Sequence, residues 1–212
     1  MDNKVFDQLC AIAYREAGIH LKAGKEALVA ARVAKRLRAL GLASEREYLR
    51  HLESDGSGEE LVSFLDAIST NFTSFMRERE HFDLLATWAK QSRVHARGQV
   101  RVWCAAAATG EEPYTIAITL LDALEGRKAD IKILATDIST KALAAATEGR
   151  YVAKTVEPLS AAQRARHFEK SGSKANGATF AVRSEVKQHI VFRRLNLSTP
   201  PFPMRTWCSV GT

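Results

Sequence analysis

Membrane-spanning runs, secretion signals, cysteine clusters and internal repeats are all missing from this chain of 212 residues. No apolar run approaches the ~20 residues that cross a bilayer, and the start, Met1-Asp2-Asn3-Lys4, has no signal-peptide pattern. The cysteines are Cys10, Cys104 and Cys208, which do not have the spacing of metal ligands. Their odd number and wide separation favour reduced thiols. These absences predict a cytoplasmic protein with no metal site and no membrane insertion.

The net charge of +7 is the main compositional signal, while 46% hydrophobic residues suffice for a real core. The charge can reflect an ordinary solvated surface, or it can serve an acidic partner such as nucleic acid or an acidic protein helix. A nucleic-acid binder would need clustered aromatic stacking residues or a known motif. The sequence shows neither, so we expect no nucleic-acid partner.

The first part of the chain has the periodicity of helices. Apolar residues repeat at helical spacing in 6–13 and 26–40, and Gly41 follows the second stripe as a helix stop. Two shorter helices follow, which makes four short helices in a compact bundle. The pattern therefore predicts an N-terminal helical domain over residues 1–90.

After a polar stretch the pattern changes to alternating strands and helices. The expected order is a strand at Val100–Cys104, a helix at Tyr114–Leu124, a strand at Ile131–Ala135 and a helix at Thr140–Glu148. This alternation predicts a parallel sheet in an α/β domain over residues 91–212. Within it, residues 151–193 are expected to hold a small antiparallel β-subdomain. Its expected elements are a helix over Ser160–Lys170 and strands at Thr179–Arg183 and His189–Arg193 around a polar turn.

The most informative stretch lies between the first strand and its helix. A turn of small residues, 105–110, is followed at once by Glu111 and Glu112, and the second strand ends in Asp137. A tight turn lets a ligand approach the backbone, and an acid at the tip of the next strand can hold a ribose. The turn lacks the G-x-G-x-x-G pattern, and its carboxylates would repel a pyrophosphate, which counts against a dinucleotide-dependent oxidoreductase. A nucleoside that carries positive charge, S-adenosylmethionine, fits instead.

Other polar residues have two interpretations each. Asn71, Thr73 and Arg77 could face a ligand, or their segment could merely cap a helix. Asn196 could contact an adenine edge or make a turn, and Asp137 on its own could be a helix N-cap. Each of these signals is weak alone, so the functional interpretation depends on their order along the chain.

Together these groups match one family in order and spacing. The matching segments are Thr-Asn-x-Thr-x-Phe-x-Arg-Glu, Thr-Gly-Glu-Glu-Pro-Tyr, Ala-Thr-Asp-Ile, Gly-Arg-Tyr and Asn-Leu. The chain resembles the chemotaxis receptor methyltransferases of the CheR type over nearly its whole length. The resemblance implies a small all-α bundle followed by a Rossmann-like S-adenosylmethionine-dependent methyltransferase sheet. It also implies protein-glutamate O-methyltransferase activity on chemoreceptors in bacterial chemotaxis.

The resemblance also implies roles for individual residues. Asn71, Thr73 and Arg77 would line the cofactor and substrate pocket, Glu112 would lie near the methionine ammonium or ribose, Asp137 near the ribose or adenine, and Asn196 and Leu197 near the adenine. A glutamate substrate is already ionised at neutral pH and needs no general base, so catalysis would depend on placement. Arg77 is the candidate for steering that carboxylate, because a guanidinium can grip two oxygens. The product would be S-adenosylhomocysteine.

The implied partners are the cytoplasmic helices of methyl-accepting chemoreceptors. Arg32, Lys35, Arg36 and Arg38 match the family's basic face that meets the acidic methylation region, although an ordinary wet helix face is the alternative. In some members the β-subdomain docks a receptor pentapeptide, and the sequence does not show whether this chain does so. The family default implies a monomer.

The C-terminal segment departs from the family. Where the family continues with Phe-Asp-x-Ile/Val-Phe-Cys-Arg-Asn, this chain has Thr206 to Thr212. The codons for that stretch, read one base earlier, permit Asp-Leu-Val-Phe-Cys-Arg-Asn. We therefore expect a frameshift near residue 204 and missing C-terminal strands. The alternative function is then a non-catalytic receptor-binding or regulatory fragment of such an enzyme.

Overall fold

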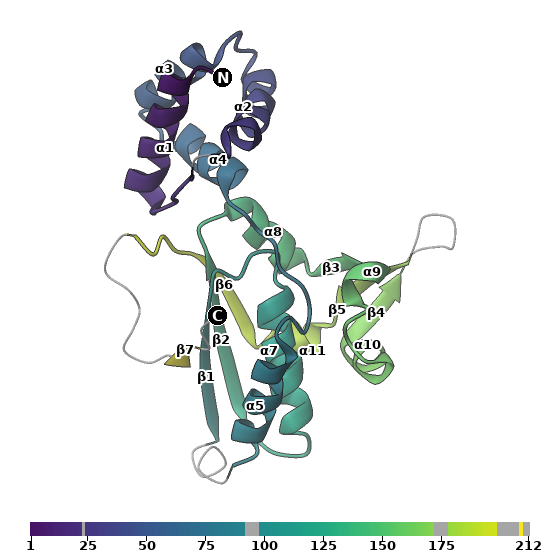
Figure 1. The fold of residues 1–212 in the computed structure, drawn as a ribbon. Coiled ribbons are helices and arrows are strands. Elements are labelled where there is room, and N and C mark those ends of the chain that lie inside the picture. The colour runs from purple at the N-terminus through teal and green to yellow at the C-terminus, as the bar shows by residue number, and fades with distance from the viewer. Residues whose placement is uncertain (23, 92–97, 172–177, 199–207, 210–212) are drawn as a thin grey trace. The chain divides into compact units, whose positions relative to one another are not determined.

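The structure is a computed structural model that describes residues 1–22, 24–91, 98–171, 178–198 and 208–209 (Figure 1). These residues form two compact units. The helical unit contains Met1–Thr70 with Ile138–Thr140 and residues 195–198, and the sheet unit contains Asn71–Asp137, Lys141–Arg194 and residues 208–209. An all-helical part followed by a part with a parallel sheet confirms the expected fold class.

The described part of the helical unit contains four helices. They are α1 (Asn3–Ala17), α2 (Glu26–Leu40), α3 (Glu45–Ser54) and α4 (Glu59–Ile68). Their apolar stripes meet in one core that includes Leu9, Val33, Tyr48 and Phe64, as the helical spacing predicted. The expected helix stop at Gly41 is confirmed: its φ of 68° is left-handed, a conformation that glycine adopts easily because it has no Cβ.

The sheet unit is built on a parallel sheet in the order β6-β2-β1-β7. Its strands are β1 (Gln99–Ala105), β2 (Asp130–Asp137), β6 (Ile190–Arg194) and β7 (Cys208–Ser209), and its longer helices are α5 (Arg79–Ala89), α7 (Glu111–Ala123) and α8 (Thr140–Glu148). The pairing of β1 with β2 runs in register from Gln99↔Asp130 to Ala105↔Thr136. The carboxyl ends of these two strands therefore lie side by side.

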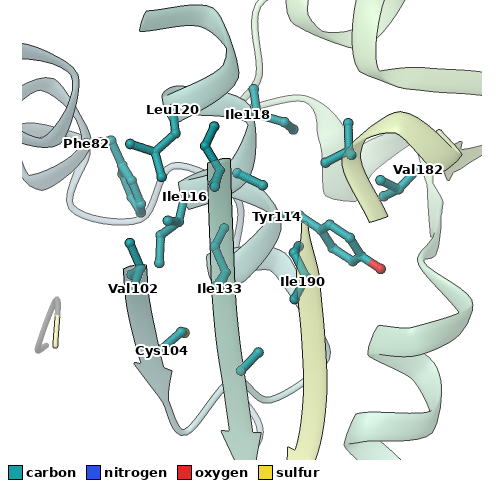
Figure 2. Packing of buried hydrophobic residues seen from close by; sticks show 14 of the residues in the cluster. Phe82, Val102, Cys104, Tyr114, Ile116, Ile118, Leu120, Ile133, Val182 and Ile190 are labelled. Atoms are coloured by element: carbon teal, nitrogen blue, oxygen red, sulfur yellow. The ribbon is translucent and has the colours of Figure 1, made fainter. Parts of the chain in front are cut away.

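Helix α7 packs on one face of this sheet (Figure 2). Its residue Ile116 shares a buried core with Val102 of β1 and Ile133 of β2, and Phe82 of α5 joins the same core. Because α5 covers α7 in this way, it belongs to the sheet unit. The sheet unit therefore begins at Asn71, which differs from the boundary after residue 90 that helical periodicity indicated.

A second sheet, antiparallel and in the order β3-β5-β4, is inserted between α8 and β6; we call it the small sheet. Its segment contains β3 (Arg150–Val152), α9 (Ala153–Val156), α10 (Ala161–His167), β4 (Phe168–Ser171), β5 (Thr179–Val182) and α11 (Ser184–Lys187). The expected antiparallel element is present, but two details were wrong. The helix expected over Ser160–Lys170 ends at His167, and the strand expected at His189–Arg193 does not pair with β5. That strand is β6, which pairs in parallel with β2, because its apolar Ile190 joins the core under α7.

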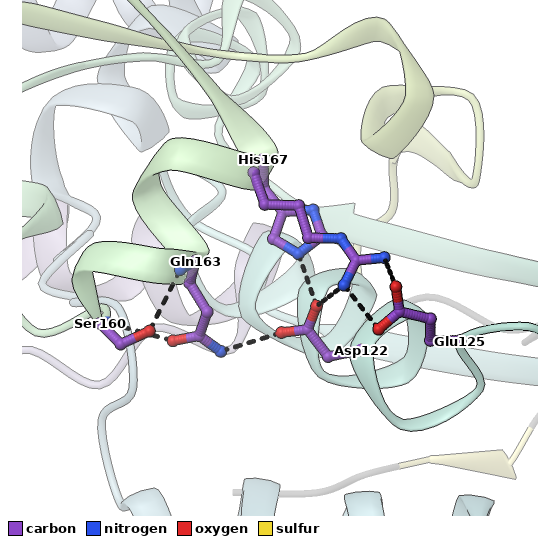
Figure 3. Close-up of polar contacts among 6 residues, drawn as sticks. Asp122, Glu125, Ser160, Gln163 and His167 are labelled. Carbon is purple, nitrogen blue, oxygen red and sulfur yellow. Dashed lines mark hydrogen bonds and ion pairs between the residues drawn. The ribbon is translucent and has the colours of Figure 1, made fainter.

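Polar side chains anchor α10 to the end of α7 (Figure 3). His167 is 4% exposed, and its Nε2 lies 2.8 Å from Oδ1 of Asp122, while Gln163 Nε2 donates to the other carboxylate oxygen at 3.2 Å. Arg166 donates two hydrogen bonds, of 2.8 and 2.7 Å, to Glu125. Burial alone would raise the pKa of Asp122, but the bonds from His167 and Gln163, with the charge of Arg166, lower it.

Among the described residues, no helix combines the length and the apolar character that crossing a membrane requires. The frameshift interpretation concerns residues 204–212, and apart from Cys208–Ser209 these lie outside the described part of the chain. The two described residues form β7, which pairs in parallel with β1 at Val102↔Cys208 and Trp103↔Ser209. The frameshift itself stays a prediction.

Candidate functional site

The turn between β1 and α7, residues 106–110, lies beside the end of β2; we call it the β1–α7 turn. The amide nitrogen of Ala107 donates to the carbonyl oxygen of Thr136 at 2.8 Å. The next amide in the chain, that of Ala108, donates to Oδ2 of the buried Asp137, also at 2.8 Å. The small-residue turn and the acid at the tip of the next strand are therefore one hydrogen-bonded structure.

The backbone of the β1–α7 turn is strained. Ala106 and Ala108 have φ angles of 58° and 46°, and Gly110 has a φ of 98°. A left-handed conformation costs a residue with a Cβ about 1–2 kcal/mol, so the surrounding bonds must hold this turn in place. Such residues concentrate at functional sites, where a fixed and unusual backbone shape serves a ligand.

The two carboxylates after the turn have different surroundings. Glu111 is buried and accepts a hydrogen bond from Thr109 Oγ1 at 2.6 Å. Glu112 is half-buried, and burial raises its pKa, although a hydrogen bond with Cys104 and the charge of Arg77 oppose the shift. Burial, followed by the charge of Glu112, also raises the pKa of the Cys104 thiol well above its usual range. Glu112 is thus an acid whose ionised form would be favoured by a cationic ligand.

A second strained segment carries Arg77. The residues on either side of it, Met76 and Glu78, have φ angles of 55° and 54°. The Arg77 side chain is exposed, its Nη1 donates to the carbonyl oxygen of Phe72 at 3.3 Å, and its guanidinium carbon lies 5.8 Å from the centre of the Phe72 ring. The backbone and the Phe72 side chain together restrict where the guanidinium can point.

The predicted site residues fall in both units. The sheet unit holds Asn71, Thr73, Arg77, Glu112 and Asp137. Asn196 and Leu197 belong to the helical unit, where Asn196 Nδ2 donates to the carbonyl oxygen of Glu16 at 2.6 Å and Leu197 is exposed. The Asn196 side chain also accepts a hydrogen bond of 3.0 Å from the backbone nitrogen of Ser198. Asn196 therefore makes a turn, one of its two sequence interpretations, and its contact with adenine stays a prediction.

One of the four predicted basic partner residues on α2 has a buried partner inside the bundle. Arg36 donates two hydrogen bonds, of 3.0 and 2.5 Å, to Glu60, which is 5% exposed. The hydroxyl of Tyr48 donates to the same carboxylate at 2.7 Å. The three side chains form a polar network within the helical core, so Arg36 has a structural role.

Arg32 also bonds within the bundle. Its Nη1 donates to the carbonyl oxygens of Ile68 and Ser69, at 2.6 and 3.2 Å, and so caps the end of α4. Lys35 and Arg38 are exposed. The exposed basic face of α2 is therefore narrower than the sequence pattern indicated, and its contact with a receptor stays a prediction.

Sequence reasoning assigned no site role to three residues that contact predicted site residues or the β1–α7 turn. Cys104 lies close enough to Glu112 to affect its pKa, the carbonyl oxygen of Phe72 accepts from Arg77, and the hydroxyl of Tyr151 donates to the carbonyl oxygen of Thr109 at 2.8 Å. The position of Cys104 at the end of a strand and that of Phe72 within a matched segment were available signals. Tyr151 also stands in a matched segment, Gly-Arg-Tyr, but its bond to Thr109 is a contact between distant parts of the chain.

Family comparisons divide the chain at the same place as the structure. Residues 4–69 match the family model "CheR methyltransferase, all-alpha domain", and residues 71–206 match "CheR methyltransferase, SAM binding domain". The chain belongs to the CheR methyltransferase family. The predicted resemblance is confirmed, and S-adenosylmethionine (SAM) is the cofactor of the domain that contains the β1–α7 turn.

Individual relatives of this CheR-family chain are chemotaxis enzymes by name. It is 41% identical over 192 residues to chemotaxis protein methyltransferase 2 of Pseudomonas aeruginosa, covering 91% of this chain and 67% of the relative. It is 40% identical to the chemotaxis protein methyltransferase of Salmonella typhimurium and 38% identical to that of Escherichia coli, in each case covering 91% of this chain and 65% of the relative. The chain thus spans about two thirds of the length of the relatives it matches.

Proposed function

We propose that this CheR-family protein transfers the methyl group of SAM to glutamate side chains of chemoreceptors in bacterial chemotaxis. The observation that carries the proposal is the hydrogen bond from the Ala108 amide to Asp137, beside the half-buried Glu112. This arrangement lies at the carboxyl ends of adjacent parallel strands, where open α/β sheets bind their ligands. We expect the protein to act in the cytoplasm as a monomer.

The residues of the β1–α7 turn fit SAM. The turn presents small alanine side chains, and we expect Asp137 at the tip of β2 to accept hydrogen bonds from ribose hydroxyls. Glu112 offers a negative charge to a ligand with an ammonium and a sulfonium group. The raised pKa of Glu112 supports this, since its ionised form lacks full compensation within the protein.

SAM supplies a methyl group bonded to a positively charged sulfur. In the proposed step a glutamate oxygen of the receptor forms a bond to that carbon, the carbon–sulfur bond breaks, and its electron pair stays on sulfur in S-adenosylhomocysteine. The acceptor is an ionised carboxylate at neutral pH, so the protein has no proton to remove. Its contribution is placement, which can supply up to about 7–11 kcal/mol in well-oriented reactions.

Arg77 is the residue proposed to place the acceptor. Its guanidinium can donate to both oxygens of a carboxylate, and the left-handed residues on either side of it give its backbone one defined shape. A grip that is too strong would stabilise the bound substrate as much as the transition state and would not raise the rate. The exposed position of Arg77 suits a residue that meets a second protein.

The proposed function can be tested on the purified 212-residue chain in two steps. Calorimetric titration with S-adenosylhomocysteine measures cofactor binding. The chain is then incubated with methyl-labelled SAM and the cytoplasmic fragment of a chemoreceptor. We expect label in the receptor that base treatment releases as methanol, because a carboxyl methyl ester is hydrolysed by base. A receptor fragment with its methylated glutamates changed to alanine is the matched control.

The two steps separate the alternatives. Cofactor binding without label transfer would favour a non-catalytic form. Label that resists base would contradict a glutamate acceptor. A folded chain that does not bind S-adenosylhomocysteine would contradict the proposal as a whole.

A further inference from the structure

Tyr151 links the small sheet to the core of the sheet unit. Its backbone lies in the middle of β3 and pairs with Phe180 of β5. Its side chain leaves the small sheet and is 7% exposed within the core that α7 shares with the parallel strands. Tyr151 therefore contributes its backbone to the small sheet, while its side chain lies beside the β1–α7 turn.

The hydroxyl of Tyr151 donates to the carbonyl oxygen of Thr109 at 2.8 Å, within the β1–α7 turn. Burial raises the pKa of Tyr151 far above its usual value, and the negative charge of Glu111 adds to the effect. The hydroxyl therefore keeps its proton and remains a donor at any pH at which the protein functions. Thr109 also donates its own side-chain hydroxyl to Glu111, so this residue is held from both sides.

The ring of Tyr151 contacts the second strained segment of the site as well. Phe75 meets it edge-on, with ring centres 5.0 Å apart and planes at 83°. Phe75 is 1% exposed and stands two residues before Arg77 in the chain. Edge-to-face pairs of buried aromatic rings favour one relative orientation. The same side chain thus contacts the turn next to Glu112 and the segment that carries Arg77.

Gly110 shows how closely the turn packs against Tyr151. A Cβ built on Gly110 would lie 2.9 Å from the Tyr151 hydroxyl oxygen and 2.9 Å from Cβ of Ala146, and its φ of 98° disfavours any side chain. Such distances are too short for non-bonded atoms, so glycine is required on steric and conformational grounds. The hydroxyl occupies the space that would otherwise let the turn shift.

We propose that Tyr151 is a positioning residue for the cofactor site, which holds the β1–α7 turn through the Thr109 carbonyl and so sets the orientation of Glu112. Tyr151 acts through the turn and not by touching the reacting atoms. The inference rests on the proposed function, because it assigns Tyr151 to the SAM site of that reaction. It also makes the small sheet a structural part of that site.

Tyr151→Phe tests the inference, because it removes the hydroxyl and keeps the ring. The matched control is Tyr114→Phe: the hydroxyl of Tyr114 is also buried and donates to a carbonyl oxygen, that of Ala146, at 2.7 Å. Each variant leaves one carbonyl oxygen without its tyrosine donor, in a part-buried bond for Thr109 and a buried bond for Ala146, so we expect the melting temperature to fall in both. Calorimetry should show affinity for S-adenosylhomocysteine about tenfold weaker in Tyr151→Phe, with wild-type affinity in Tyr114→Phe.

A second measurement needs no ligand. Amide hydrogen exchange in residues 106–112 should be faster in Tyr151→Phe than in Tyr114→Phe, because only the former frees the turn. Equal affinity and equal exchange in the two variants, with a wild type that binds, would overturn the role of Tyr151 alone. A wild type that does not bind S-adenosylhomocysteine would overturn the proposed function and, with it, this role.

Discussion

The helical unit and the sheet unit differ in where the chain adopts left-handed backbone. Among the described residues of the helical unit, every positive φ belongs to a glycine, such as Gly18 and Gly41 at the ends of α1 and α2. In the sheet unit Met76, Glu78, Ala106 and Ala108 also have positive φ. The first pattern stops helices at no steric cost. The second stores strain beside Arg77 and Glu112, which is typical of a site that must hold a ligand.

Two glutamates show the same contrast. Glu60 in the helical unit is buried, but Arg36 and Tyr48 give its carboxylate three hydrogen bonds. Glu112 in the sheet unit is less buried, yet its pKa is raised because its partners do not offset the loss of water. A carboxylate with complete partners stabilises the fold, whereas one with incomplete partners suits a ligand that completes them.

The largest loss of stability is expected when the hydrogen-bond network of Arg36, Tyr48 and Glu60 is broken. Arg36→Met leaves the buried Glu60 without its cation, and we expect the free energy of unfolding to fall by about 3 kcal/mol. Urea denaturation followed by circular dichroism measures this. Arg38→Met removes an exposed arginine from the same helix and should change stability by less than about 0.5 kcal/mol. Equal losses in the two variants would mean that the network does not stabilise the bundle.

Arg77→Ala should affect the proposed reaction and leave the fold intact, because the side chain is exposed. We expect turnover to fall about 100-fold, the loss that a misplaced reacting group causes, while affinity for S-adenosylhomocysteine changes far less. Arg77→Lys is the matched variant: it keeps the charge but not the two-nitrogen grip, and should recover part of the rate. Steady-state kinetics with a receptor fragment measures both. Unchanged turnover in Arg77→Ala would remove Arg77 from the mechanism.

Glu112→Gln should weaken SAM binding about tenfold, since a charged partner for a cationic ligand is lost. The pKa of Glu112 is raised by burial above its ordinary value of 4.5, so the folded state holds its proton to higher pH than the unfolded state. Protonated Glu112 therefore stabilises the folded protein at pH values below the pKa that Glu112 has in the unfolded chain. This stabilisation is lost as the pH rises through the higher pKa of Glu112 in the folded protein.

The same variant should therefore raise the melting temperature at pH 7, and the advantage should vanish when the pH is lowered to about the unfolded value. Cofactor affinity of the wild type should fall as the pH approaches the raised pKa, because the carboxylate becomes protonated. Thermal scans and calorimetry across this range check both trends. A variant that is less stable than wild type at pH 7 would show that Glu112 is fully compensated inside the protein.

The smallest effects come from a pair of backbone changes with opposite signs. Gly41→Ala puts a Cβ on a left-handed residue of the helical unit and should cost about 1 kcal/mol. Ala106→Gly removes a Cβ from a left-handed residue of the β1–α7 turn and should stabilise by about 0.5 kcal/mol. Chemical denaturation of both variants gives the signs. Destabilisation by Ala106→Gly would mean that the turn is not strained.

Local patterns were enough for most of the secondary structure and for the turn on which the proposed site is built. The helix Thr140–Glu148 was predicted to the residue, and the strands around Val102 and Ile133 lie where the apolar runs indicated. The β1–α7 turn and Asp137 were recognisable because a turn of small residues and an acid at a strand tip are features of neighbouring residues. The turn and Asp137 lie together because the two consecutive strands pair in parallel, as consecutive strands in an α/β domain usually do.

Features that depend on which surfaces meet could not be predicted in the same way. Residues 189–193 have the pattern of a strand, but the pattern does not say whether the partner is β5 or β2. Helix α5 has a helical stripe, but the stripe does not say whether it packs on α4 or on α7. Arg36 is a charged residue of a type that usually lies at the surface. Only its hydrogen bonds to Glu60 on another helix make Arg36 part of the core.

The sequence by itself determined most of the helical and stranded segments, the turn of small residues with its carboxylates, and membership of a methyltransferase family, because each depends on residues that are close in the chain. The tertiary structure alone decided the packing of α5 on α7, the pairing of β6 with β2 and the bond from Tyr151 to Thr109. The physical reason is that periodicity shows which face of an element is buried, whereas packing between distant elements decides what covers that face.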